Sequence, residues 1–500
     1  MAALLLAASL LSGCGKQEPA QEQKPEKSDF PVSFNTALLY NAQHSSYDEK
    51  AEQRRQEILA MPDTVKPSET GKTYYISYKG NDQNDGLSAE KAWRSSARLG
   101  MVADTLNEGD VVLFERGGLY RGAFVLTSGV TYGAYGEGCK PNIYGSQRDY
   151  AFPELWTPSK EEGVWEMKVD GLNDIGNIVF DHGEKCGTKK LKNKLMKNGD
   201  FYHDTDNAIL YLYHEDGDPG SAYYDIELCS NENLLTGYAN THDVTIENLC
   251  LKYTGAHGIG FSTNSKNITV TGCEIGYIGG SMLGSANVRY GNGFEVVDNC
   301  DTITVRDNWI YQCFDAGMTH QSSYAPGCIQ RDIVFRRNHV EACNYNIEYY
   351  VSSENGRIED TVYEENYLQN AGYGFGSVNR IGSDPGMLAH ICCYVRRMPC
   401  RNFVIRNNIF DSSRGDLLTV GAPNDAEGLG PIMAGNSYIQ NARERDAPVA
   451  LLYDSHTGQR VALSAATETE LVAAIRRVDT SPRYVHMRYE TDFGGAKESP

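Results

Sequence analysis

A six-residue pattern recurs along the second half of the chain, and it constrains the fold more than any other feature. Each copy places an apolar residue first and sixth, with polar residues or glycine between them. The copies are "IENLCL", "VTGCEI", "VRDNWI", "FRRNHV", "YEENYL" and "IRNNIF", and "MAGNSY" fits less well. Strand periodicity points the first apolar residue inward, and a bend at the polar pair lets the sixth point inward as well. Such a repeat buries its core only by stacking, which predicts a solenoid.

The fourth position of the pattern is predicted to form a ladder. It holds Asn308, Asn338, Asn366, Asn408 and Asn436 in the later copies, and Leu249 and Cys273 in the first two. Asparagine tolerates the left-handed turn conformation, and its amide can bond to the next copy. Five residues further on, Cys313 and Cys343 fit a column of small buried residues; a disulfide between them is the less favoured interpretation.

The first part of the chain resembles a known family. The segments "YYISYKGNDQNDGLSAEKAW", "GDVVLFERGGLYRG" and "YGAYGEGCKP" are similar to the N-terminal cap of secreted right-handed parallel β-helix proteins, the pectate-lyase-like superfamily. There, a helix covers the open end of the coil stack; here Ser88 would cap a helix running through Leu99. The resemblance implies an all-β, right-handed parallel β-helix with an N-terminal helical cap. It implies no particular activity, because many chemistries use this scaffold.

The domain organisation follows from breaks in this rhythm. The start "MAALLLAASLLSGCG" resembles a bacterial lipoprotein signal in which Cys14 is lipidated, and a polar tether follows it. Hairpin-like strands interrupt the coils and predict a lateral antiparallel β insertion. We expect a signal at 1–14, a tether at 15–35, a helix, cap and first coils at 36–149, the insertion at 150–228, the β-helix core at 229–442 and a C-terminal cap region at 443–500.

These features predict the location and exclude some partners. We expect a monomer anchored by lipid to the bacterial cell envelope, on its outer surface or in the periplasm, whose globular part does not enter the membrane. The formal net charge of -20 disfavours nucleic acid, whose binding rests on neutralising phosphates. No cofactor is required by the sequence. Asp82, Asn84 and Asp85 could bind calcium, although an Asx-rich turn is the preferred interpretation, since the twelve-residue loop pattern is absent.

A second strand in each coil supplies the candidate catalytic residues. We align these strands on Ile259, Phe294, Met318, Ile347, Phe375 and Leu417. The next residue should then point outward, which gives Gly260, Glu295, Thr319, Glu348, Gly376 and Leu418. Glu295 and Glu348, two coils apart, would lie ~9–10 Å from each other. Asp315 and His320 flank Thr319, so the predicted catalytic residues are Glu295, Glu348, Asp315 and His320.

Residues bordering this face are predicted to bind substrate: His257, Arg289, Asn292, Tyr349, Tyr350, Tyr373 and Arg380. Aromatic faces stack on sugar rings, and arginines bind uronate or sulfate. For His257 and His320, a structural role in the core or on the surface stays open as an alternative. His390, placed in a long loop, is a weaker candidate.

The leading hypothesis is a carbohydrate-active enzyme that hydrolyses a polysaccharide or oligosaccharide with paired carboxylates. The alternatives are β-elimination on a uronate, with Arg289, His320 or His257 as base, and a non-catalytic glycan-binding or adhesion protein. Neither the acidic calcium cluster of related pectate lyases nor the residue set of polygalacturonases has a clear copy here.

Overall fold

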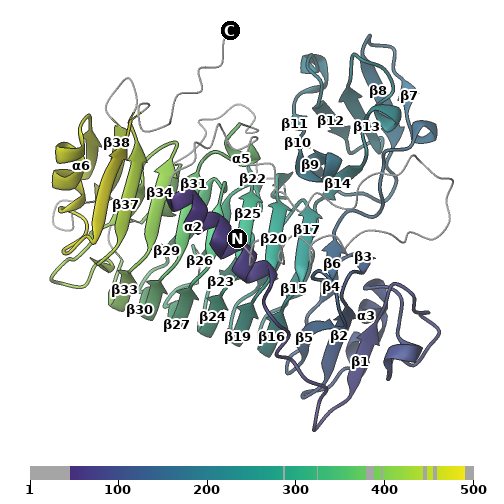
Figure 1. The fold of residues 1–500 in the computed structure, drawn as a ribbon, viewed down its shortest axis with the longest axis horizontal. Coiled ribbons are helices and arrows are strands. Elements are labelled where there is room, and N and C mark those ends of the chain that lie inside the picture. The colour runs from purple at the N-terminus through teal and green to yellow at the C-terminus, as the bar shows by residue number, and fades with distance from the viewer. Residues whose placement is uncertain are drawn as a thin grey trace, which may run out of the picture.

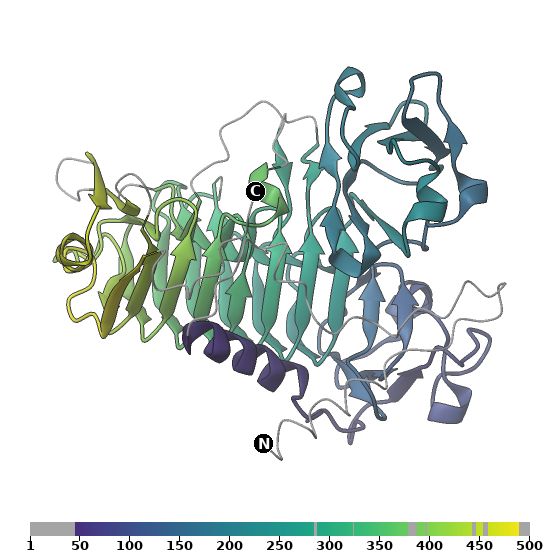
Figure 2. The same ribbon diagram turned by 45° about the horizontal axis from the view of Figure 1, so that its top comes forward.

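The computed structural model describes residues 46–489, except 285–287, 324, 379–387, 396–397, 443–446 and 454–458. The fold is a right-handed parallel β-helix, as the repeat and the family resemblance predict (Figure 1). Three long sheets, here called A, B and C, run side by side along one axis (Figure 2). Cys14 and Arg380 lie outside the described residues, so lipidation and the envelope location stay predictions.

Sheet A carries the first half of each repeat copy, and its neighbouring strands pair in parallel. Its strands are β1 (Thr73–Ile76), β2 (Val111–Glu115), β5 (Thr131–Tyr135), β16 (His242–Glu247), β19 (Ser265–Thr271), β24 (Cys300–Arg306), β27 (Ile329–Arg336), β30 (Arg357–Glu364), β33 (Cys400–Arg406) and β36 (Ile432–Ala434).

Sheet B carries the second half of each copy. Its strands are β3 (Leu119–Arg121), β6 (Asn142–Tyr144), β17 (Cys250–Thr254), β20 (Glu274–Ile278), β25 (Trp309–Cys313), β28 (His339–Glu341), β31 (Tyr367–Ala371), β34 (Ile409–Ser413), β37 (Ser437–Asn441) and β40 (Tyr484–Arg488).

Sheet C completes each coil and carries the candidate site. Its strands are β4 (Phe124–Val125), β15 (Leu235–Gly237), β18 (Ile259–Phe261), β23 (Phe294–Val297), β26 (Ala316–Ser322), β29 (Tyr345–Val351), β32 (Ala389–Cys392), β35 (Leu418–Gly421), β38 (Ala447–Tyr453) and β39 (Arg460–Ala465). Only the β38–β39 pairing is antiparallel among the described pairings of this sheet.

The apolar pairs of the repeat line the inside of the coil. The pairs Val270/Ile275, Val305/Ile310, Phe335/Val340, Tyr363/Leu368 and Ile405/Phe410 are all fully buried in one continuous core. A fully buried side chain of this size contributes roughly 1.5–3 kcal/mol relative to an exposed one. The core therefore depends on stacking one coil on the next.

The asparagine ladder is confirmed. Asn308 Nδ2 donates to Asn338 Oδ1 at 3.0 Å, and Asn338, Asn366 and Asn408 repeat the contact with the next asparagine. The ladder ends where Asn436 Nδ2 donates to Asp479 at 2.8 Å. The left-handed conformation belongs to the residue before each ladder position, as at Asp307 and Asn407, both with φ 57°. The ladder asparagine thus satisfies the backbone at a bend that its neighbour makes.

The strands expected to form a lateral insertion make two smaller sheets beside the coil (Figure 1). They have their own apolar core, which includes Trp156, Phe180 and Phe201. The elements are β7 (Thr157–Pro158), β8 (Val164–Lys168), β9 (Ile175–Phe180), β10 (Lys185–Cys186), β11 (Thr188–Lys189), β12 (Asp200–Asp204), β13 (Ile209–Tyr213), α4 (Pro219–Ala222) and β14 (Ile226–Ser230). All these pairings are antiparallel except β11 with β12. A short hairpin, β21 (Ser281–Met282) and β22 (Arg289–Tyr290), contacts β9.

Helices cover the ends and one side of the coil. Helix α3 (Ala97–Val102) packs on β4 at the N-terminal end, and α6 (Glu468–Ile475) packs on β39 and β40 at the C-terminal end. Helix α2 (Ser46–Leu59) lies across sheet B (Figures 1 and 2). The other helical segments are α5 (Phe375–Val378) and the 3-10 helices η2 (Ala89–Lys91), η3 (Ala103–Thr105), η4 (Pro153–Leu155), η5 (Asp181–Gly183) and η6 (Lys192–Lys194).

Two helix and boundary predictions need adjustment. The single helix expected from Ser88 through Leu99 is instead η2, which Ser88 caps, followed by α3. Parallel pairing also continues past residue 442 into β38 and β40, within the region expected to be a cap. The remaining domain boundaries stay predictions. Within the described residues, no helix is long and apolar enough to cross a membrane.

Candidate functional site

The outer face of sheet C, defined by Glu295, Thr319 and Glu348, forms in the predicted register. Glu295 pairs with Thr319, which pairs with Glu348, so the three side chains make one column on successive strands. The preceding residues Phe294, Met318 and Ile347 are fully buried inside the coil. Alternation along a strand therefore points the column outward.

The predicted register fails after β29. The segment around Phe375 forms α5, and the next strand of sheet C is β32, where Ile391 pairs with Ile347. Leu418, not Leu417, pairs with Ile391. The outward column therefore continues through Cys392 and Thr419 rather than through Gly376 and Leu418.

Glu295 is a buried carboxylate held by three donors. It is 4% exposed. Asn292 Nδ2 donates to it at 3.0 Å and Gln321 Nε2 at 2.7 Å, and His257 Nδ1 lies 2.6 Å from its Oε2. Burial alone would raise the pKa of Glu295, but the charge of His257 and the three hydrogen bonds outweigh it, so the pKa is lowered. The group is therefore an anion at neutral pH.

His257 and Asn292 occupy equivalent positions, each two residues before the inward residue of its strand. The backbone N–H of His257 donates to Asn233 Oδ1 at 3.1 Å, and its ring meets the Tyr290 ring edge-on, with centroids 5.1 Å apart. The backbone N–H of Asn292 lies 3.2 Å from His257 Nδ1. The structure therefore brings together three of the predicted residues, His257, Asn292 and Glu295.

Glu348 lies at the aromatic end of the column. It is 6% exposed and accepts a hydrogen bond from Thr319 Oγ1 at 3.1 Å. Burial first, and then neighbouring charges that include Glu348, raise the pKa values of Cys392 and Tyr394. Asp315, which is half-buried, also contributes to the shift at Cys392. These carboxylates thus share one neighbourhood.

Tyr345 and Tyr394 are site residues that sequence reasoning missed. The Tyr394 ring lies edge-on to Tyr345 and to Tyr350, with centroids 6.2 Å and 5.8 Å apart. The Tyr394 side chain is 43% exposed. Tyr345 stands two residues before Ile347, the position that holds Asn292 before Phe294, so the same spacing could have revealed it.

The prediction that His320 lies on the outer face is wrong. Since Thr319 points outward, alternation turns His320 inward. It is fully buried, with Nδ1 2.7 Å from Gln330 Oε1 and Nε2 in contact with the Tyr363 hydroxyl. Burial lowers the pKa of His320 to about 4. Tyr349, its neighbour on β29, is likewise fully buried and packs edge-on to Phe403, so neither residue can reach a substrate on this face.

Arg289 and Tyr373 lie outside the strands that carry the column. Arg289 is buried, donates from Nη2 to the Gly176 carbonyl at 2.6 Å and lies 4.5 Å from the Phe314 ring centroid. It therefore joins the β21–β22 hairpin to the insertion. Tyr373 lies between β31 and α5, and Arg380 is outside the described residues. His390 is in β32 rather than a loop, and burial lowers its pKa to about 3.

The acidic side chains of the turn near the N-terminus accept hydrogen bonds from backbone N–H groups of the same segment. Asp82 Oδ1 accepts from the backbone N–H groups of Arg94 and Ser95 at 2.7 and 3.0 Å, and Asp85 Oδ1 accepts from that of Leu87 at 3.0 Å. Within the described part of the chain, no group of three or more His, Cys, Asp or Glu residues is arranged to hold a metal ion.

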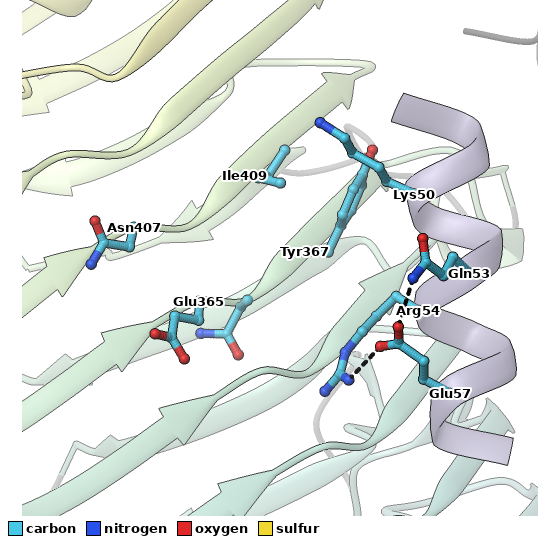
Figure 3. Close-up of a pocket in the computed structure, with 9 residues that line it drawn as sticks. Lys50, Gln53, Arg54, Glu57, Glu365, Tyr367, Asn407 and Ile409 are labelled. Carbon is cyan, nitrogen blue, oxygen red and sulfur yellow. Dashed lines mark hydrogen bonds and ion pairs between the residues drawn. The ribbon is translucent and has the colours of Figure 1, made fainter. Parts of the chain in front are cut away.

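A separate hollow of about 170 Å³ lies between α2 and sheet B (Figure 3). Side chains of the helix face those of β31 and β34 across it. Its lining residues are Lys50, Gln53, Arg54, Glu57, Glu365, Asn366, Tyr367, Asn407 and Ile409. None of the predicted site residues is among them.

No protein-family profile and no curated protein sequence matches this chain. Among solved structures, it is similar to XylC in complex with xylose, at 11% identity and a TM-score of 0.41, covering 79% of this chain and 74% of that one. It is also similar to pectate lyase Pel9A, at 9% identity and a TM-score of 0.40, with the same coverage. It is similar as well to a GH136 lacto-N-biosidase from Eubacterium ramulus, at 13% identity and a TM-score of 0.38, covering 89% of this chain and 70% of that one. Such values carry no argument about what this chain cleaves.

Proposed function

We propose that the protein is a carbohydrate-active enzyme that hydrolyses a glycosidic bond at the outer face of sheet C. The observation that carries the proposal is the pair Glu295 and Glu348, two buried carboxylates in one outward column two strands apart. Two strand spacings place their backbones about 10 Å apart. In inverting glycosidases the two carboxyl groups lie ~6.5–9.5 Å apart, a separation that side chains on two such strands can span.

The two carboxylates have different surroundings, as an acid–base pair requires. Glu295 is kept ionised by His257, Asn292 and Gln321. Glu348 has a hydroxyl donor, Thr319, and aromatic neighbours. In this proposal Glu348 protonates the oxygen of the leaving sugar. Glu295 supplies the negative charge at the other end of the column.

The charges of the site favour hydrolysis over β-elimination. Elimination needs a cation to neutralise the uronate carboxylate, whereas the ionised Glu295 would repel that carboxylate. Arg289 is engaged by backbone carbonyls and an aromatic ring, and His320 is sealed in the core. We therefore propose a neutral glycan as substrate.

Tyr394 is expected to stack on a sugar ring. Its ring is exposed and lies edge-on to the rings of Tyr345 and Tyr350, which hold its orientation. We expect Tyr394→Ala to weaken binding about ten-fold, which corresponds to about 1.4 kcal/mol. Tyr394→Phe should keep most of the affinity, since it keeps the ring. Calorimetric titration of glycan into a Glu348→Gln background, which prevents turnover, measures the change.

The matched control is Tyr484→Ala, since Tyr484 is 39% exposed on sheet B. It should leave binding unchanged. Equal losses for Tyr394→Ala and Tyr484→Ala would contradict a stacking role.

The direct test is incubation of the full chain with a panel of neutral plant, algal and host glycans, together with uronate-containing ones. Hydrolysis predicts new reducing ends from a neutral glycan without the ultraviolet absorbance of an unsaturated uronate. The appearance of that absorbance would instead indicate a lyase. Saccharide binding with no new reducing ends after long incubation would indicate a non-catalytic binding protein.

A further inference from the structure

Glu295 is poorly placed to take a proton itself. Its Oε1 accepts from Gln321, and its Oε2 accepts from Asn292 and contacts His257. An ionised carboxylate has about four acceptor positions, and three are filled here inside the protein. With 4% of the residue exposed, little of Glu295 remains for water or substrate.

His257 has the opposite arrangement. Its Nδ1 lies 2.6 Å from the ionised Oε2 of Glu295, so Nδ1 carries the proton and donates it. The longer 3.2 Å contact from the Asn292 N–H competes for the same nitrogen, but the charged contact is the stronger. In the neutral ring, Nε2 is then the acceptor. Among the described residues Nε2 has no hydrogen-bond partner, and 14% of the side chain is exposed.

We propose that, within the hydrolytic site proposed above, His257 is the group that accepts the proton of the attacking water and Glu295 is a positioning residue that fixes its tautomer. The inference rests on that proposed function. His257 Nε2 takes a proton from water as the water oxygen bonds to the anomeric carbon. The glycosidic C–O bond breaks, and the leaving oxygen takes the proton of the Glu348 carboxyl group. Solvent then removes the proton from His257 and returns one to Glu348.

Two strands of sheet C separate the proposed base from the proposed acid. His257 precedes β18 and Glu348 is on β29, three strand spacings or about 14 Å apart at the backbone. Glu295 and Thr319 lie on the two strands between them. The His257 side chain leans towards Glu295, and that of Glu348 leans towards Thr319. The two side chains thus lean towards each other over the strands that separate them.

A double-mutant cycle tests the assignment, using initial rates on the glycan that the panel identifies. His257→Ala should lower kcat about 10²–10³-fold, as expected for loss of a general base. If Glu295 acts through His257, the double variant His257→Ala/Glu295→Gln should be no slower than His257→Ala within about three-fold. Added imidazole should restore part of the activity of His257→Ala. Multiplying losses would show that Glu295 acts directly and would overturn the inference.

The matched control is His182→Ala, because His182 is also a partly exposed histidine held by a carboxylate, with Nδ1 3.1 Å from Asp225. It should leave the rate unchanged.

A second measurement is independent of turnover and of variant folding. Nitrogen NMR of the histidine-labelled wild-type chain should show the neutral form of the His257 ring with its proton on Nδ1 and none on Nε2. A neutral ring with its proton on Nε2 would overturn this inference even if hydrolysis is found. A wild-type chain that hydrolyses no glycan would overturn the proposed function, and the catalytic role of His257 with it.

Discussion

Replacing Glu348 with glutamine is expected to lower kcat about 10²–10⁴-fold, the usual contribution of a general acid. Glutamine has nearly the shape of glutamate, and its carbonyl can still accept the hydrogen bond from Thr319 Oγ1. The variant therefore removes the transferable proton while keeping the packing of a residue that is only 6% exposed. Initial rates of reducing-end release measure the loss.

The matched control is Glu364→Gln on β30. Glu364 is 9% exposed and paired with Arg406, so the same change is made at a buried strand carboxylate on sheet A. Its kcat should be that of the wild type. If Glu348→Gln keeps full activity while Asp315→Asn loses it, Glu348 is not the acid and Asp315 takes that role.

The coil and the carboxylate column could be predicted from the sequence because both depend on short-range periodicity. Val305 and Ile310 of one copy both point into the core, and Asn308 between them forms a hydrogen bond with Asn338 of the next copy. Neighbouring coils repeat this relation, so stacking follows from the pattern alone. Glu295 and Glu348 then fall on one face by alternation.

Where a long insertion separates two coils, the same periodicity does not predict which segment forms the next strand. The segment around Phe375 has the local composition of a sheet C strand but forms α5. Ile391, further along the chain, takes the strand position instead and pairs with Ile347. His320 is predicted on the outer face as a neighbour of Thr319, but alternation along the strand turns it inward. Its burial depends on Gln330 and Tyr363, partners from two other strands that no local pattern reveals.

The attachment of α2 to sheet B is equally invisible in the sequence. Arg55 donates from Nη1 to both oxygens of Glu341, at 3.0 and 2.9 Å, across 286 residues. Both side chains are buried, and Glu341 also accepts from Trp309 Nε1 at 2.8 Å. Burial alone would raise the pKa of Glu341, but the charges of Arg55 and His339 outweigh it and lower the pKa to about 2.

Arg55→Met is therefore expected to destabilise the protein by about 3–5 kcal/mol at neutral pH, because it leaves the Glu341 carboxylate buried and without its main counter-charge. The free energy of unfolding is measured in urea, and hydrogen exchange of the α2 and β28 amides shows whether the helix opens first. Gln53→Ala, an exposed change on the same helix, should stay within about 0.5 kcal/mol of the wild type. Arg55→Met/Glu341→Gln should recover much of the loss, since glutamine keeps an acceptor for Trp309 without the charge.

The pH dependence separates an ionic contribution from simple packing. The folded pKa of Glu341 lies below the ordinary glutamate value of about 4.3, so the pair stabilises the fold above that pH and its contribution disappears as pH falls towards about 2. Arg55→Met lacks the main cause of the lowered pKa, so its buried carboxyl group takes up a proton at higher pH. The stability difference between wild type and Arg55→Met should therefore shrink as the pH is lowered from 6 to 3. A difference that stays constant over this range would mean that Arg55 acts through the packing of its aliphatic stem rather than through its charge.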